Sequence, residues 1–111
     1  MKHIFHLPEE YSFEKVGIRG KIFDTLSDGV EFVVIETEKG HETKIREKEC
    51  TFSYFVLEGE GNFEIEGKTE RCQKGDLVFI PNNTAFKYTG RMKMLLVSTP
   101  SYFAEQEETL E

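Results

Sequence analysis

The hydrophobic residues of this chain fall in short runs that alternate with polar residues, and a period of two predicts β-strands. The clearest run is Tyr54–Leu57, where aromatic and aliphatic residues suit a half-buried strand. The next four residues, Glu58-Gly-Glu-Gly61, are interpreted as a glycine turn that leads into a second strand at Phe63–Ile65. Lys74–Pro81 repeats this order of turn, apolar run and proline.

Similar runs recur about every 8–12 residues, which is typical of a β-sandwich or a β-barrel. No convincing amphipathic helix accompanies them, so the predicted fold class is all-β. The segment His41–Lys48 is polar. The expected strands are Ile4–Leu7, Val16–Phe23, Val30–Thr37, Thr51–Leu57, Phe63–Ile65, Thr69–Cys72, Leu77–Ile80, Ala85–Thr89 and Met92–Ser98.

The length of 111 residues fits one domain that covers residues 1–111. Residues 1–15 are expected to form an irregular N-terminal arm. Residues 101–111 are expected to form an acidic C-terminal tail, either a frayed helix or disordered. Cys50 and Cys72 are too few for a disulfide framework, so both are predicted to be free thiols.

The net charge of −7 disfavours broad contact with nucleic acid or an anionic membrane, because both need a basic surface. No apolar run approaches the roughly 18 residues of a membrane-spanning helix. The first residues are interrupted by His3, His6 and Pro8, unlike a secretory signal. A cytoplasmic protein is therefore expected, with neither nucleic acid nor membrane as a partner.

Two glycine-bounded segments carry a resemblance to a known family. The first runs from Gly40 to Gly59, and the second runs from Gly75 through Ile80-Pro81 to Gly90. Over residues 40–97 their spacing resembles the cupin superfamily motifs G-x5-H-x-H-x3–4-E-x6-G and G-x5-P-x-G-x2-H-x3-N. The resemblance implies a small double-stranded β-helix, or jelly-roll barrel. It implies much less about activity, because one fold hosts many functions.

Cupins usually bind one divalent metal ion with three histidines and a glutamate. The four corresponding positions in this chain hold Arg46, Lys48, Phe52 and Phe86. Phenylalanine has no lone pair to donate, and two cations repel a 2+ ion at short range. We therefore expect no metal site and no cofactor.

Side chains alternate across a strand, so an inward Phe52 also directs Tyr54 and Val56 into the barrel, and Phe86 does the same for Tyr88. These residues either fill a small barrel or line an aromatic pocket for a small molecule.

Three polar residues are further candidates for the site. Arg46 and Lys48 either bind an anionic group at the mouth of the barrel or form a solvated strand edge. His41 is the candidate for proton transfer, with Tyr54 or Tyr88 as its partner.

Three functions remain open. The preferred hypothesis is a metal-free cupin-like protein that binds a small molecule. Arg46 and Lys48 would allow this molecule to be anionic. An enzyme of the type of the metal-independent sugar epimerases and isomerases is the second. The third is a dimeric interaction module with a filled barrel. Phe55 and Leu57 point opposite to Tyr54, and exposed apolar faces usually become interfaces, so a homodimer is expected.

Overall fold

A computed structural model describes residues 2–101 and 107–110, and within these residues the chain forms nine strands and no helix. The prediction of an all-β fold is confirmed. The strands are β1 (Phe13–Lys15), β2 (Ile18–Ile22), β3 (Glu31–Thr37), β4 (Gly40–Glu47), β5 (Thr51–Ile65), β6 (Lys68–Gln73), β7 (Leu77–Ile80), β8 (Ala85–Thr99) and β9 (Glu107–Thr109).

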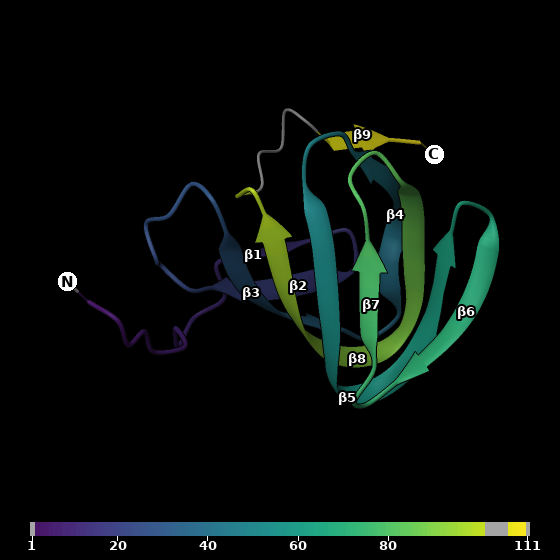
Figure 1. The fold of residues 1–111 in the computed structure, drawn as a ribbon. Helices are drawn as coiled ribbons and strands as arrows, with labels where there is room; N and C mark the ends of the chain where they lie inside the picture. Colours follow the sequence, from purple (N-terminus) through teal and green to yellow (C-terminus); the bar gives the residue numbers. More distant parts are fainter. Residues whose placement is uncertain (1, 102–106, 111) are drawn as a thin grey trace.

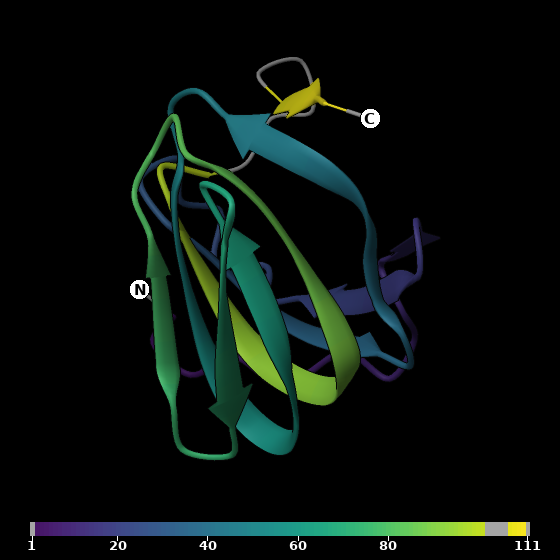
Figure 2. The same ribbon diagram turned by 90° about the vertical axis from the view of Figure 1, so that its right-hand side faces the viewer.

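Two long antiparallel strands, β5 and β8, organise the barrel. They pair with each other from Thr51↔Thr99 to Ile65↔Phe86 and bend together, so that each contributes to two walls of the barrel (Figure 1). One wall has the order β1-β2-β3-β8-β5-β7. In the other, β4 pairs with the first part of β8 and β6 pairs with the last part of β5. Figure 2 shows the two walls facing each other across the interior, which is the jelly-roll arrangement.

The predicted glycine turn at Glu58–Gly61 is wrong, because these residues continue β5 without reversing the chain. The bend passes through the pair Gly61↔Gly90, and a β-bulge lies between Val56 and Glu58. Gly90 has a φ of +119°, and a Cβ there would lie 2.5 Å from the carbonyl oxygen of Glu60. Glycine therefore lets two bent strands approach closely here instead of forming a hairpin.

The same bend explains a second difference. Ala85–Thr89 and Met92–Ser98, predicted as separate strands, are two parts of the continuous β8. At the other end of the wall, the single strand predicted at Val16–Phe23 begins later, at Ile18. The positive φ angles of Val16 and Gly17 make a turn that joins it to β1.

Both termini also differ from the prediction. Residues 4–7 are not a strand, whereas the expected irregular arm contains β1, which pairs with β2. In the expected frayed or disordered tail, β9 pairs with β4 through Ile45↔Thr109 and Glu47↔Glu107. Residues 102–106 and 111 of that tail lie outside the described residues. Backbone pairing with an available strand edge overrode the acidic composition of this segment.

The core lies between the two walls and is built from the inward positions of every long strand. Val33, Val34 and Ile35 are all buried, as the nearly continuous apolar run in this segment predicts. Cys50 and Cys72 are free thiols in the core, and burial raises the pKa of both. Among residues 2–101 and 107–110, no helix has the length and hydrophobicity needed to span a membrane.

Candidate functional site

Three strands bring His41, Tyr54 and Tyr88 together at the centre of the barrel. His41 of β4 lies directly opposite Tyr88 of β8, and their ring centroids are 5.8 Å apart. Tyr54 of β5 approaches Tyr88 in an edge-to-face arrangement with 5.6 Å between ring centroids. All three side chains are at least nine-tenths buried. Inward alternation on adjacent strands therefore places an imidazole and two phenols in one cluster.

The hydroxyl group of Tyr88 is the most unusual polar group of the cluster. The side chain is 1% exposed, and its Oη has no hydrogen-bond partner among the described residues. Burial alone raises the pKa of Tyr88, so the phenol keeps its proton at neutral pH. A buried donor without a partner costs about 1–3 kcal/mol, and native proteins rarely tolerate one without a reason.

The ring of His41 is held in one orientation by the backbone. Its Nδ1 donates a hydrogen bond to the carbonyl oxygen of Thr43 at 2.7 Å, since a carbonyl can only accept. The neutral ring then carries its basic lone pair on Nε2. The register of β4 against β8 shifts between His41 and Ile45, and this irregularity brings the Thr43 carbonyl back toward the ring.

Aromatic rings surround the three candidate residues. Phe52 and Phe86 lie in the core with ring centroids 5.9 Å apart, and each also contacts Tyr54. Phe63 stacks on Tyr88 at 4.8 Å and lies 5.3 Å from Tyr54, although the sequence did not identify it as a site residue. Its inward alternation was visible, but the assumed turn at residues 58–61 separated it from Tyr54.

Arg46 and Lys48 lie at the end of β4 and in the bend that follows it. Lys48 is exposed in the bend after β4, and Arg46 lies on β4 opposite Ala85. The buried residue at this end of β4 is Glu47, which is 2% exposed. Its Oε1 accepts hydrogen bonds from the backbone N–H groups of Glu49 and Cys50, at 2.8 and 3.3 Å. Nothing in the mixed charges of this segment distinguishes Glu47 in the sequence.

The residues at the usual metal-ligand positions do not fit a metal ion. Phe52 and Phe86 offer packed hydrocarbon rings, and Lys48 offers an exposed ammonium group. Within residues 2–101 and 107–110, no three His, Cys, Asp or Glu side chains gather in a group able to hold an ion. The chemistry of the cluster is that of an imidazole, two phenols and aromatic faces.

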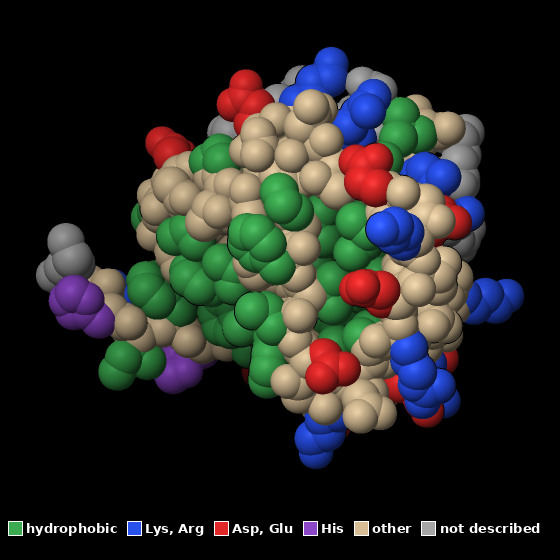
Figure 3. All heavy atoms as spheres, turned by 45° about the vertical axis from the view of Figure 1, so that its right-hand side comes forward, with side chains coloured by type: hydrophobic (Ala, Val, Ile, Leu, Met, Phe, Trp, Pro, Cys, Tyr) green, Lys and Arg blue, Asp and Glu red, His purple; other side chains and the backbone are tan. Residues whose placement is uncertain are grey.

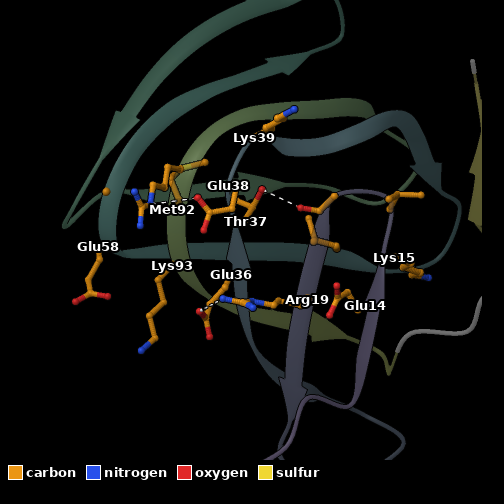
Figure 4. Close-up of a pocket in the computed structure, with 15 residues that line it drawn as sticks. Glu14, Lys15, Arg19, Glu36, Thr37, Glu38, Lys39, Glu58, Met92 and Lys93 are labelled. Carbon is orange, nitrogen blue, oxygen red and sulfur yellow. Dashed lines mark hydrogen bonds and ion pairs between the residues drawn. The ribbon is translucent and has the colours of Figure 1, made fainter.

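Two cavities lie near the barrel without enclosing His41 or the two tyrosines. The larger, about 850 Å³, runs beside the β1–β2 turn and is lined by charged side chains such as Arg19, Glu36 and Lys93 (Figure 4). The smaller, about 240 Å³, lies between β6 and β7 and has Phe63 in its wall. Phe63 therefore separates this cavity from the rings of Tyr54 and Tyr88.

Residues 31–98 match the sequence profile of the Cupin_2 family, described as the cupin domain. This chain is a cupin. The match covers β3 to most of β8, which includes every residue of the aromatic cluster. The resemblance and the jelly-roll barrel that it implied are thus confirmed.

The cupin is also similar to individual proteins. It is 34% identical over 62 residues to the uncharacterised protein MJ1618 of Methanocaldococcus jannaschii, across 52% of this chain and half the length of that relative. The structure of Pac13 of Streptomyces, a nucleoside dehydratase, superposes with a TM-score of 0.92 at 25% identity, covering 100% of this chain and 92% of Pac13. KdgF from Halomonas superposes with a TM-score of 0.75 at 18% identity, covering 85% of this chain and 88% of KdgF.

Proposed function

We propose that this cupin binds a nucleoside-like small molecule in its barrel without a metal ion, and that Tyr88, Tyr54 and His41 form the polar part of the site. The observation that carries the proposal is the buried hydroxyl of Tyr88, which has no partner among the described residues. A ligand oxygen or nitrogen would supply that partner. The surrounding aromatic faces suit a planar base or a sugar ring.

The substrate class comes from the likeness to Pac13. Its histidine-to-glutamine variant and its two tyrosine-to-phenylalanine variants have each been solved with uridine. Those three positions are spaced by 13 and 34 residues, and so are His41, Tyr54 and Tyr88 in this chain. Equal residue types at equal spacing on the same fold support an equivalent site.

Proton transfer is the second candidate function, and the hydrogen bond from His41 to Thr43 favours it. This bond leaves Nε2 as the basic nitrogen of the neutral ring, and His41 lies directly opposite Tyr88 on the neighbouring strand. In a dehydration, a base removes a proton from carbon, the neighbouring carbon–oxygen bond breaks, and the hydroxyl group leaves as water with a proton from an acid. His41 would be the base. Tyr88 keeps its proton and would be the donor to the leaving oxygen.

A ligand requires room among packed rings, and the cavity of about 240 Å³ has in its wall Phe63, which stacks on Tyr88. Movement of the Phe63 ring would join this cavity to Tyr54 and Tyr88. The proposal therefore includes a rearrangement of side chains when the ligand enters, as is common in ligand sites.

The test is calorimetric titration of uridine, thymidine and adenosine into the purified protein, followed by the same titration into Tyr88→Phe. Loss of one hydrogen bond is expected to weaken binding by about tenfold. Tyr11→Phe is the matched control, because Tyr11 is exposed and its hydroxyl bonds to Glu36 far from the cluster. Mass spectrometry of the incubated nucleosides then tests for loss of water, which His41→Gln should abolish.

Absence of binding by every nucleoside would overturn the nucleoside assignment. Binding that Tyr88→Phe and Tyr11→Phe leave equally strong would place the ligand elsewhere. Binding without loss of water from any of these compounds would leave the binding function and remove the dehydration.

A further inference from the structure

Glu47 is a buried carboxylate on the inner face of the barrel, at the end of β4 away from His41. On the face drawn in Figure 3, acidic side chains lie at the surface, several of them beside basic side chains. Glu47, in contrast, is 2% exposed. It follows Ile45 by two residues, and Ile45 is buried opposite Phe86. Residues two apart on a strand share a face, so the Glu47 side chain lies on the same inner face as Ile45.

The two carboxylate oxygens of Glu47 have different surroundings. Oε1 accepts hydrogen bonds from the N–H groups of Glu49 and Cys50, so it stabilises the bend after β4. Oε2 is buried and has no hydrogen-bond partner among residues 2–101 and 107–110. A glutamine could supply the first oxygen without a charge, so the bend does not explain the carboxylate. A buried acceptor on a charged group is costlier to leave unsatisfied than a neutral one, which indicates that Oε2 serves a ligand.

Aromatic rings lie between Glu47 and the cluster of His41 and Tyr88. The ring of Phe52 is 5.9 Å from that of Phe86, and both side chains are buried. His41 pairs with Tyr88 and Ile45 with Phe86, so His41 and Glu47 are separated by the length of about four residues, or ~13 Å of strand. A nucleoside whose sugar lies at His41 and Tyr88 would therefore direct its base past the phenylalanine rings toward Glu47.

We propose that Glu47 selects the base of the ligand, with Oε2 accepting a hydrogen bond from the N3–H group of a uracil-type base. The inference rests on the proposed function, which places the sugar at the other end of the site. An ionised carboxylate can only accept, whereas the protonated Tyr88 hydroxyl can donate to an oxygen of the ligand. The two groups thus require a donor at one end of the ligand and an acceptor at the other.

The number of available oxygens favours uracil or thymine over the other bases. Only Oε2 of Glu47 lacks a partner among the described residues, and a uracil or thymine nucleoside has a single base N–H group. Guanine presents two adjacent N–H groups, which suit a carboxylate with both oxygens available. Cytosine and adenine carry an unprotonated nitrogen at the corresponding ring position, and its lone pair would face the carboxylate.

The first test changes the ligand and leaves the protein as it is. Calorimetric titration compares uridine with 3-methyluridine, which lacks the N3–H group, and with 5-methyluridine, which carries the same added methyl group but keeps N3–H. Loss of a hydrogen bond to a charged group should weaken binding of 3-methyluridine by at least about 30-fold. The affinity for 5-methyluridine should stay within about threefold of that for uridine, because its N3–H is retained.

The second test reverses the hydrogen-bonding character at Oε2 with Glu47→Gln. The N–H groups of Glu49 and Cys50 require the amide oxygen at the Oε1 position, so the amide NH₂ group replaces Oε2 and faces the N3–H of the base. The ratio of uridine affinity to cytidine affinity should fall by at least about 30-fold. Glu49→Gln is the matched control, since Glu49 is exposed and contacts Glu47 through its backbone N–H.

A change in this ratio separates base selection from a purely structural role, which would weaken both nucleosides alike. Circular dichroism and urea unfolding verify the fold of both variants. Equal affinities for uridine and 3-methyluridine would overturn the role of Glu47, as would equal ratios in Glu47→Gln and Glu49→Gln. Either result leaves nucleoside binding in the barrel intact. Absence of binding by every nucleoside would instead overturn the proposed function, and the base selection with it.

Discussion

At the scale of single residues, Tyr88 links the stability of this cupin to its proposed function. Its ring stabilises the core through the stack on Phe63, while its hydroxyl is desolvated without a partner among the described residues. A phenylalanine would keep the packing and remove the desolvated group. Retaining the hydroxyl at a cost in stability is what a binding group requires.

The raised pKa of Tyr88 predicts a fall in stability at alkaline pH. Below about pH 10 the phenol is protonated in both the folded and the unfolded chain, so pH has no effect through this group. Above it, the unfolded chain loses the proton while the folded protein retains it, and the free energy of unfolding falls by up to about 1.4 kcal/mol per pH unit. Urea unfolding of wild type and Tyr88→Phe at pH 8 and pH 11 measures this.

The difference in stability between the wild type and Tyr88→Phe isolates the effect of the Tyr88 hydroxyl, because lysines and cysteines titrate in both proteins. The wild type should lose more stability than Tyr88→Phe over this range. Equal losses would mean that the hydroxyl of Tyr88 finds solvent or a partner in the folded protein.

At the scale of elements, β4 positions the site by its close approach to β8. Gly40 begins β4 with a φ of +118°, and a Cβ there would lie 2.1 Å from the carbonyl oxygen of Tyr88. Its N–H also donates to the buried Oγ1 of Thr37 at 2.6 Å. This contact fixes the start of the strand that carries His41. The bend of β5 at Gly61 then carries Phe63 to the same centre.

Gly40→Ala is therefore expected to destabilise the protein by more than about 2 kcal/mol, because both the φ angle and the contact with β8 oppose a side chain. Gly29→Ala is the control, since the nearest atom to a Cβ there is 3.8 Å away and φ is not positive. Thermal and urea unfolding measure the difference. Equal stability of the two variants would contradict the close packing of β4 on β8.

At the scale of the whole molecule, the two walls of the barrel have different outer surfaces. The wall that contains β7 exposes Phe55, Leu77 and Phe79 on its outside, beside a cross-strand row of alternating charges that runs from Arg19 to Glu58. The aromatic cluster lies inside, between the walls. The proposed binding in the barrel and the expected association of two copies would use opposite sides of the same strands, since neighbouring residues such as Tyr54 and Phe55 alternate between them.

The expected association of two copies predicts that the melting temperature rises with protein concentration, because dimers unfold to separate chains by mass action. Differential scanning calorimetry of the wild type over a hundredfold range of concentration should reveal this rise. For Phe79→Lys the melting temperature should stay constant. A wild-type melting temperature that is independent of concentration would contradict the dimer.

The sequence by itself determined the all-β class, the cupin family and the inward side of most strands. These depend on local alternation, on glycine spacing and on the motif segments at residues 40–97, all of which are properties of nearby residues. Hence the burial of Phe52, Tyr54, Phe86 and Tyr88 followed from counting along each strand.

Only the tertiary structure decided whether a glycine reverses a strand or bends it, because the same residue serves both purposes. The choice depends on the partner strand, as with Gly61 opposite Gly90. For the same reason the place of Phe63 beside Tyr54 and Tyr88 became recognisable only in three dimensions, since Tyr88 lies on a strand distant in sequence. The pairing of β9 with β4 is likewise a long-range contact. The lack of a partner for the Tyr88 hydroxyl among the described residues also depends on distant strands, and no local pattern encodes either feature.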